Sequence, residues 1–154
     1  MIEIDIPGKA VLQLEHAVFD VNGTLALDGE LLPGVAERMA ALRAHLTVHM
    51  LTADTHGRQA QIDEQLGFSA TIIERGAVEK AAYVLNLGAD HVVAIGNGAN
   101  DANMMQAAAL SIAVLGPEGL SVAALKSAEV VVASITDALD LLLHPDRLRA
   151  TLRR

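Results

Sequence analysis

The apolar residues of this chain gather in short runs that are separated by glycine, aspartate or asparagine. Runs rich in Val, Ile and Leu predict strands, and the middle runs are continuous, which is typical of parallel strands covered on both faces. Between these runs, apolar positions recur at helical spacing. The predicted strands are 2–6, 11–14, 17–21, 46–51, 70–73, 91–95, 111–115 and 130–132, and the predicted helices are 34–45, 55–66, 77–87, 100–109, 120–127 and 136–143.

Residues that favour helix ends agree with these boundaries. Pro33 precedes the first predicted helix, Asp54 and Thr55 can cap the second, and Gly67 and Gly88 close the second and third. Strand–helix alternation with short connections predicts an α/β fold. We expect a doubly wound, Rossmann-like parallel sheet in a single domain that spans the whole chain.

The two ends of the chain depart from this alternation. Residues 1–15, with Pro7-Gly8 between two short strands, predict a β-hairpin beside the main sheet. Residues 145–154 form a basic tail that holds four of the eleven basic residues. A solvated terminal helix is the simpler interpretation of this tail, and contact with a phosphate or a partner is the other.

Composition narrows the possible functions. Of the 154 residues, 52% are hydrophobic and only 2% aromatic, so Ala, Val, Leu and Ile must build the core. Few aromatic rings for base stacking and a net charge of −8 argue against nucleic-acid binding. The absence of Cys excludes disulfides and zinc–thiolate sites. No apolar stretch reaches the roughly 18 residues that span a bilayer, and the first residues lack the basic pattern of a signal peptide. We therefore expect a cytoplasmic protein with no membrane contact.

Four polar features fall where predicted strands or helices end. Asp20 follows a buried apolar run and precedes a Gly turn, and Thr52 stands just before a predicted helix. Lys80 is alone among the apolar and small residues of its helix, and a Gly-rich loop ends in Asp101. Each residue alone could be an ordinary turn former, cap or surface lysine. Together, an acid, a hydroxyl, a base and a second acid at successive element ends favour a ligand site at the carboxyl edge of the sheet.

These residues also carry a family resemblance. Residues 19–25 resemble the first motif of the haloacid dehalogenase-like hydrolases, and 51–54, Lys80 and 96–101 resemble the other three. The last stretch, continued to Val114, is similar to the phosphorylation domain of P-type ATPases. The resemblance is therefore to the small, soluble P-type ATPase-like branch of the superfamily. It implies a Rossmann-like fold, Mg²⁺ as cofactor, and phosphoryl transfer through an aspartyl-phosphate.

The resemblance assigns a role to each matching position. Asp20 becomes the nucleophile, while Thr52 and backbone amides hold phosphoryl oxygens. Lys80 neutralises the charge spread over those oxygens and pairs with Asp20. The expected catalytic residues are thus Asp20, Asn22, Thr52 and Lys80; the substrate-binding residues are Gly23, Thr24, Ala53, Gly98 and Asn100; and the metal-binding residues are Asp20, Asn22 through its carbonyl, Asn97 and Asp101.

Two positions depart from the family pattern. The family's hydrolases usually have a second acid two residues after the nucleophile, where this chain has Asn22. An amide cannot act as a general acid or base, and loss of that role typically costs about 10²–10⁴-fold in rate. Asn97 likewise replaces the first acid of the fourth motif, which removes one charge beside the metal. The resemblance with these departures predicts slow turnover and weakened Mg²⁺ binding.

The gaps between the motifs leave no room for a cap domain. Residues 25–51 hold a short turn, one helix and one strand, and residues 55–79 hold one helix and one strand. Exclusion of water must then come from a second subunit or from the substrate, so we expect a homo-oligomer. The predicted function is a slow Mg²⁺-dependent phosphatase-type hydrolase that acts on a phosphorylated small molecule or macromolecule. A non-catalytic or regulatory protein that binds phosphate, metal or a partner is the alternative, and dehalogenation is less favoured than either.

Overall fold

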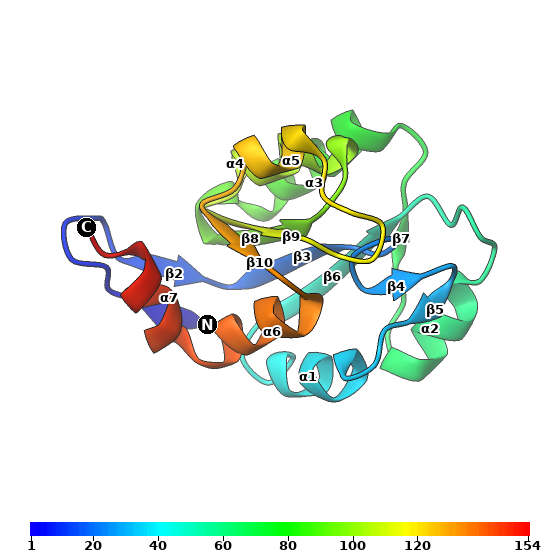
Figure 1. Ribbon diagram of the computed structural model, residues 1–154, viewed down its shortest axis with the longest axis horizontal. Helices are drawn as coiled ribbons and strands as arrows, with labels where there is room; N and C mark the ends of the chain where they lie inside the picture. Colours follow the sequence, from blue (N-terminus) through cyan, green and yellow to red (C-terminus); the bar gives the residue numbers. More distant parts are fainter.

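A computed structural model describes all residues from Met1 to Arg154. Its centre is a six-stranded sheet in which every pair of neighbouring strands is parallel (Figure 1). From one edge to the other, the strands are β10 (Val130–Val132), β9 (Leu110–Val114), β8 (Val92–Gly96), β3 (His16–Asp20), β6 (Thr47–Thr52) and β7 (Thr71–Ile72). The strand order reverses beside β3, so the predicted doubly wound α/β sheet is confirmed.

Helices cover both faces of this sheet (Figure 1). One face carries α1 (Val35–Leu42), α2 (Gln59–Leu66) and α6 (Ile135–Leu143), and the other carries α3 (Gly76–Leu87), α4 (Ala102–Ala107) and α5 (Val122–Lys126). Two 3₁₀ turns, η1 (Ala89–His91) and η2 (Ala99–Asp101), precede β8 and α4. As predicted, α2 and α3 end at glycines in the left-handed conformation, Gly67 and Gly88.

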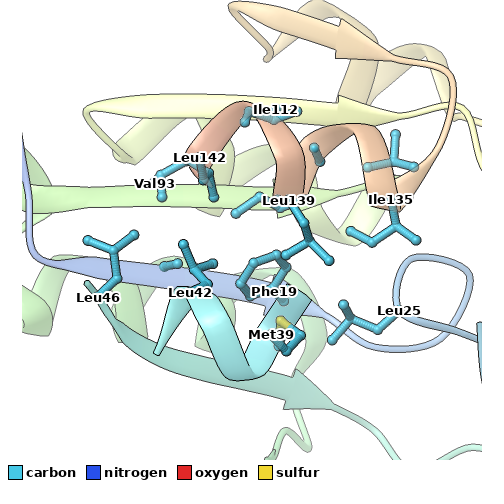
Figure 2. Close-up of a cluster of buried hydrophobic side chains, with 14 of the residues drawn as sticks. Phe19, Leu25, Met39, Leu42, Leu46, Val93, Ile112, Ile135, Leu139 and Leu142 are labelled. Atoms are coloured by element: carbon cyan, nitrogen blue, oxygen red, sulfur yellow. The ribbon is translucent and has the colours of Figure 1, made fainter. Parts of the chain in front are cut away.

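The two faces of the sheet have cores of unequal size. A cluster of 26 buried hydrophobic residues lies on the α1 and α6 face, where Phe19, Met39 and Leu139 meet (Figure 2). A smaller cluster of 11 residues lies on the α3 and α4 face and includes Val18. Side chains alternate along a strand, so Phe19 and Val18 point to opposite faces. Asp20 continues the alternation on the face of Val18, and this is the face from which α3 presents Lys80.

The ends of the chain pack together away from the carboxyl edge of the sheet. Strands β1 (Ile2–Ile4) and β2 (Leu12–Leu14) form an antiparallel pair that is separate from the main sheet. Helix α7 (Pro145–Leu152) packs against this pair and buries Leu148 in the larger core. The four arginines of the tail remain exposed.

Two local features differ from the sequence prediction. Helix α2 begins at Gln59, four residues later than predicted, because Asp54 takes a positive φ of 51° and breaks the helical path. The Asp54 carboxylate still accepts a hydrogen bond from the Gln59 amide at 3.0 Å, so it caps the helix from a distance. The turn after the first motif is a small hairpin of β4 (Ala26–Leu27) and β5 (Glu30–Leu31). No helix of the chain combines the length and the apolar character that crossing a membrane requires.

Candidate active site

The carboxyl ends of β3, β6 and β8 bring the predicted site residues to one edge of the sheet. Asp20 is the last residue of β3, Thr52 is the last residue of β6, and Asn97 directly follows β8. The three strands are neighbours with β3 in the middle. The apolar runs that build the sheet therefore also align these polar ends, as parallel strands do in ligand-binding α/β folds.

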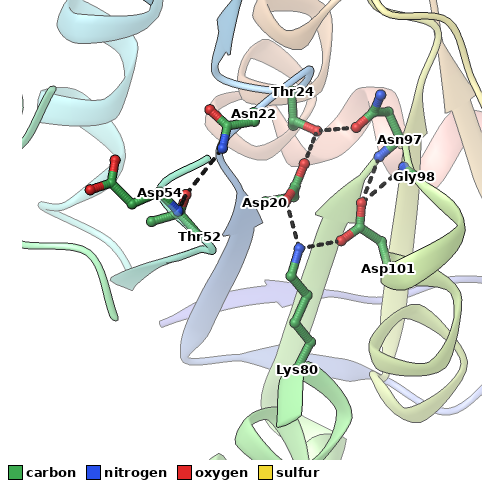
Figure 3. Close-up of polar contacts among 9 residues, drawn as sticks. All are labelled: Asp20, Asn22, Thr24, Thr52, Asp54, Lys80, Asn97, Gly98 and Asp101. Atoms are coloured by element: carbon green, nitrogen blue, oxygen red, sulfur yellow. Dashed lines mark hydrogen bonds and ion pairs between the residues drawn. The ribbon is translucent and has the colours of Figure 1, made fainter. Parts of the chain in front are cut away.

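A buried ion-pair triad lies at the centre of this edge (Figure 3). The Lys80 Nζ donates to Asp20 Oδ1 at 2.6 Å and to Asp101 Oδ1 at 2.8 Å. Lys80 lies on the face of α3 that also buries Val84, one turn further along, so helix packing aims the ammonium at Asp20. An ammonium has three protons, and these two bonds leave one for a ligand in the pocket.

Burial and charge shift both ends of the Asp20–Lys80 pair. Burial, followed by repulsion from Asp101, raises the pKa of Asp20 from 3.8 to about 7, although Lys80 and Thr24 oppose the shift. Burial would lower the pKa of Lys80, but attraction to the two carboxylates outweighs it and raises that pKa. With all three groups ionised, the triad carries one net negative charge. A buried site with this charge favours a cation beside Asp20.

Thr24 connects the loop that follows Asp20 to the end of β8. Its buried hydroxyl lies 3.1 Å from Asp20 Oδ2 and 3.1 Å from Asn97 Oδ1 and shares its proton between them. The Asn97 Nδ2 donates in turn to the Gly119 carbonyl oxygen at 3.2 Å. The side-chain amide of Asn97 thus joins three segments of the chain that lie far apart in sequence.

Thr52 lies on the other side of Asp20, and its hydroxyl hydrogen is not used in a hydrogen bond within the protein. Its hydroxyl oxygen accepts hydrogen bonds from Asn22 Nδ2 at 3.2 Å and from the Asp54 amide at 2.9 Å (Figure 3). Both bonds use the oxygen as acceptor, so the hydroxyl proton can be donated to a ligand. This arrangement suits a residue that holds a phosphoryl oxygen.

The polar groups surround a pocket of about 220 Å³. This volume is below the range of roughly 300–1,000 Å³ that is usual for small-molecule pockets, so it suits a phosphoryl group rather than a whole metabolite. Predicted site residues make up most of the lining: Asp20, Asn22, Ala53, Lys80, Asn97, Gly98 and Asn100. A larger groove of about 360 Å³ lies between the β4–β5 hairpin and α2 and is lined by none of the predicted residues.

Comparison with known proteins identifies the family. Residues 75–133, which include Lys80 and the loop from Gly96 to Asp101, match the family described as haloacid dehalogenase-like hydrolase. The chain is also 39% identical over 103 residues to the "probable cation-transporting ATPase G" of Mycobacterium tuberculosis. The chain belongs to the haloacid dehalogenase-like hydrolases. The likeness to the ATPase supports the P-type ATPase-like branch of this family, as the motifs predicted.

The matched segments cover unequal shares of the relatives. The match to the ATPase takes in 66% of this haloacid dehalogenase-like chain but only 13% of the transporter. An uncharacterised protein of Methanocaldococcus jannaschii, MJ0073, is 48% identical over 62 residues, which are 40% of this chain and 67% of that protein. The ATPase-like similarity thus concerns a small part of a much longer protein.

Solved structures of haloacid dehalogenase-like phosphatases share the fold. The 3-deoxy-D-manno-octulosonate 8-phosphate phosphatase of Moraxella catarrhalis, solved with magnesium, phosphate and sugar, aligns with a TM-score of 0.67 at 17% identity. That alignment covers 91% of this chain and 94% of the phosphatase. A phosphoserine phosphatase in a phospho-aspartyl intermediate analogue aligns with a TM-score of 0.64 at 16% identity, over 86% and 99% of the two chains. The chain has the fold of these phosphatases.

Asp101, which the sequence predicts as a metal-binding residue, makes three hydrogen bonds within the protein. It is fully buried, and it does not line the pocket. Its Oδ1 accepts from Lys80, and its Oδ2 accepts from the amides of Asn97 at 3.1 Å and Gly98 at 2.9 Å. The geometry therefore favours Asp101 as the group that holds Lys80 and the loop after β8.

Glu118 lines the pocket although the sequence analysis did not single it out. It stands in the turn after β9, a fourth strand whose carboxyl end lies at the same edge of the sheet. Its place after a strand, which it shares with Asn97, was the available signal.

The oxygen atoms that line the pocket beside Asp20 fit a Mg²⁺ site. Magnesium prefers oxygen ligands, keeps several waters, and is usually held by one or two carboxylates plus a substrate phosphate. Asp20, the Asn22 carbonyl and the Asn97 side-chain oxygen supply such ligands around the pocket, and the net charge of the triad favours a cation.

Proposed function

We propose that this protein is a Mg²⁺-dependent phosphohydrolase that forms an aspartyl-phosphate on Asp20 and releases it slowly. The buried Lys80–Asp20–Asp101 triad is the observation that carries the proposal, because an ammonium between two carboxylates at a phosphate-sized pocket suits phosphoryl transfer. The phosphatase fold and the ATPase-like motifs support the same chemistry.

In the first step, a carboxylate oxygen of Asp20 attacks phosphorus, a new O–P bond forms, and the bond from phosphorus to the leaving group breaks. The free proton of Thr52 and the third proton of Lys80 stabilise the charge on the phosphoryl oxygens. The leaving group takes its proton from water, because Asn22 has none to give at usual pH. Bound Mg²⁺ would neutralise charge on Asp20 and on the phosphoryl oxygens.

In the second step, water attacks phosphorus and restores the Asp20 carboxylate with release of inorganic phosphate. This step needs a base to take a proton from the water. The Asn22 amide cannot do so, and its nitrogen is already committed to Thr52. We therefore place the slow step at hydrolysis of the aspartyl-phosphate.

The size of the pocket limits the substrate class. The lined volume of about 220 Å³ encloses the phosphoryl group, and no inserted domain covers the opening. The remainder of the substrate then lies outside the pocket, where few contacts of this chain can select it. We infer a phosphate monoester or acyl phosphate on a small molecule, with a second subunit as the means of closing the site.

A panel of phosphorylated metabolites and an aryl phosphate, assayed with and without Mg²⁺, tests this function. We expect slow phosphate release that requires Mg²⁺ and that falls by about 10³-fold or more in Asp20→Asn, since the nucleophile is lost. Phosphate release that is unchanged in Asp20→Asn would contradict the proposal. Absence of release from every compound would favour the non-catalytic alternative, which the two amides at Asn22 and Asn97 also support.

A further inference from the structure

The turn that carries Glu118 is pressed against the loop that follows Asp20. A Cβ built on Gly116 would lie 2.8 Å from the Gly23 carbonyl oxygen, so the two backbones meet at a distance that only glycine allows at position 116. The Gly119 amide donates to the Gly116 carbonyl at 2.9 Å and closes a turn with Pro117 and Glu118 at its tip. The turn therefore holds Glu118 at a fixed place beside the pocket.

Asn97 fastens this turn at its far end. Its side-chain nitrogen donates to the Gly119 carbonyl at 3.2 Å, and its backbone carbonyl accepts from the Ser121 amide at 2.9 Å. A carboxylate at position 97 could accept but could not donate, so it would lose the bond to Gly119. The amide at position 97 thus has a structural task that an acid cannot perform.

The Glu118 carboxylate reaches the Asn97 side of the pocket. A Cβ built on Gly23 would clash with the Glu118 Oε2 and would lie 2.8 Å from the Asn97 Nδ2. Gly23 has no Cβ, which leaves this space open for the carboxylate, and its positive φ of 81° is one that glycine adopts readily. Asn22, by contrast, points its side chain toward Thr52 on the opposite side of Asp20 (Figure 3).

Glu118 is also the free acid of the pocket. Asp20 and Asp101 share Lys80, and none of the ion pairs of the chain includes Glu118. Glu118 is itself exposed and lies near the exposed side chains of Asp28 and His56, with one ligand atom of each of the three within 4.8 Å of the others. Asp28 repels an ionised Glu118, whereas a cation held by Asp20 and Asn97 would attract it.

We propose that Glu118 supplies the second carboxylate of the Mg²⁺ site, and that Asn97 remains an amide because it holds the turn that carries Glu118. Glu118, in the turn after β9, thereby provides the negative charge that the amide of Asn97 lacks. This inference rests on the proposed function, since it assigns a further ligand to the same metal.

Titration of the purified chain with MgCl₂ by calorimetry, and with Mn²⁺ by electron paramagnetic resonance, tests the assignment without any turnover. Glu118→Gln keeps the size of the side chain and removes its charge. We expect Mg²⁺ affinity to fall by about 10–100-fold, the usual cost of removing a group that supports a metal site. Asp28→Asn is the matched control, because it removes one exposed negative charge beside Glu118, and we expect a change of at most about fivefold.

A compensating variant makes the test more specific. Asn97→Asp/Glu118→Gln returns a carboxylate to the site from another position, and we expect it to bind Mg²⁺ more tightly than Glu118→Gln alone. Circular dichroism checks the fold of each variant. Equal affinity in Glu118→Gln and in the wild-type chain would overturn this proposal alone. An equal loss in His56→Gln would overturn it too, by placing the cation at the outer group. No binding by the wild-type chain would overturn the proposed function as well.

Discussion

The two sides of the Asp20 carboxylate are built in different ways. The charged side consists of Lys80 and Asp101, and the amide side consists of Asn22 and Asn97. On the charged side, buried groups of opposite charge pair with one another within 2.8 Å. On the amide side, each side-chain nitrogen donates to another segment, from Asn22 to Thr52 and from Asn97 to Gly119. In the proposed mechanism, the site thus keeps the charges that transfer a phosphoryl group to Asp20. Asn22 stands where proton transfer needs an acid, and Asn97 leaves the metal site with one charge fewer.

The largest expected effect is a loss of stability when Lys80 is removed from the charged side. Lys80→Met leaves two buried carboxylates without their cation, and breaking such a buried pair costs about 3–5 kcal/mol in the free energy of unfolding. Urea denaturation at about pH 8, above the raised pKa of Asp20 of about 7, measures the loss. Lys126→Met removes an exposed lysine from α5 and should change stability by about 0.5 kcal/mol at most. Equal stabilities of the two variants would show that the triad contributes nothing to the fold.

The pH dependence of stability sharpens the same comparison. The pKa of Asp20 is raised by burial and by Asp101 from 3.8 to about 7, so the folded state binds this proton more tightly than the unfolded state. This contribution to stability is complete below about pH 4 and is lost as the pH rises through about 7. In metal-free buffer, Asp20→Asn should therefore gain stability over the wild-type chain across this range, by about 2–4 kcal/mol at pH 8.

Thermal or urea unfolding of both proteins from about pH 4 to pH 8 gives the difference directly. Mg²⁺ should reduce the difference at high pH, because a cation beside Asp20 stabilises the ionised carboxylate of the wild-type chain. Parallel stability profiles for the two proteins would mean that the triad does not hold Asp20 in a strained, charged state.

A carboxylate on the amide side should speed turnover. Asn22→Asp supplies a group that can protonate the leaving group and activate water, so kcat for an aryl phosphate should rise by up to about 10²-fold. The new carboxylate cannot donate to Thr52 and would accept its proton instead, so KM should rise as well. Asn22 and Asn97 each precede a glycine and such pairs deamidate, so intact mass must be checked before each assay. A kcat no higher than that of the fresh wild-type chain would refute the acid/base interpretation of position 22.

The weakest expected effect concerns self-association. Without a cap, the opening of the pocket needs cover, and apolar side chains such as Val122 and Leu125 on α5 are exposed. We predict a dimer or tetramer by light scattering at micromolar concentration. A monomer of 16.1 kDa would contradict this prediction and would favour closure of the site by a larger substrate.

The sequence was informative where local chemistry decides the structure. Continuous apolar runs located β3, β8 and β9, and the polar residues that follow strands located Asp20, Thr52 and Asn97. Helix α2 begins later than predicted because Asp54 takes a positive φ, which the hydrophobic pattern of this segment does not indicate. The β4–β5 hairpin was missed as strands because each has only two residues.

Parts of the site depend on which segments meet in space. The three hydrogen bonds of Asp101, one of them to Lys80, could not be predicted from the sequence, and its role in metal binding stays a prediction. Apart from its position after a strand, nothing local distinguishes Glu118 from a surface acid. Its place at the pocket arises from the contact between Gly116 and Gly23, two residues far apart along the chain.

Acid-quench mass spectrometry after mixing with Mg²⁺ and a small acyl or aryl phosphate tests the central claim most directly. If the charged side transfers the phosphoryl group and the amide side slows its release, the wild-type chain accumulates phosphate on Asp20. Asn22→Asp should then accumulate less under the same conditions, because its second step is faster, and Asp20→Asn should accumulate none. A wild-type chain without phosphate on Asp20, or a label that persists in Asp20→Asn, would contradict the account.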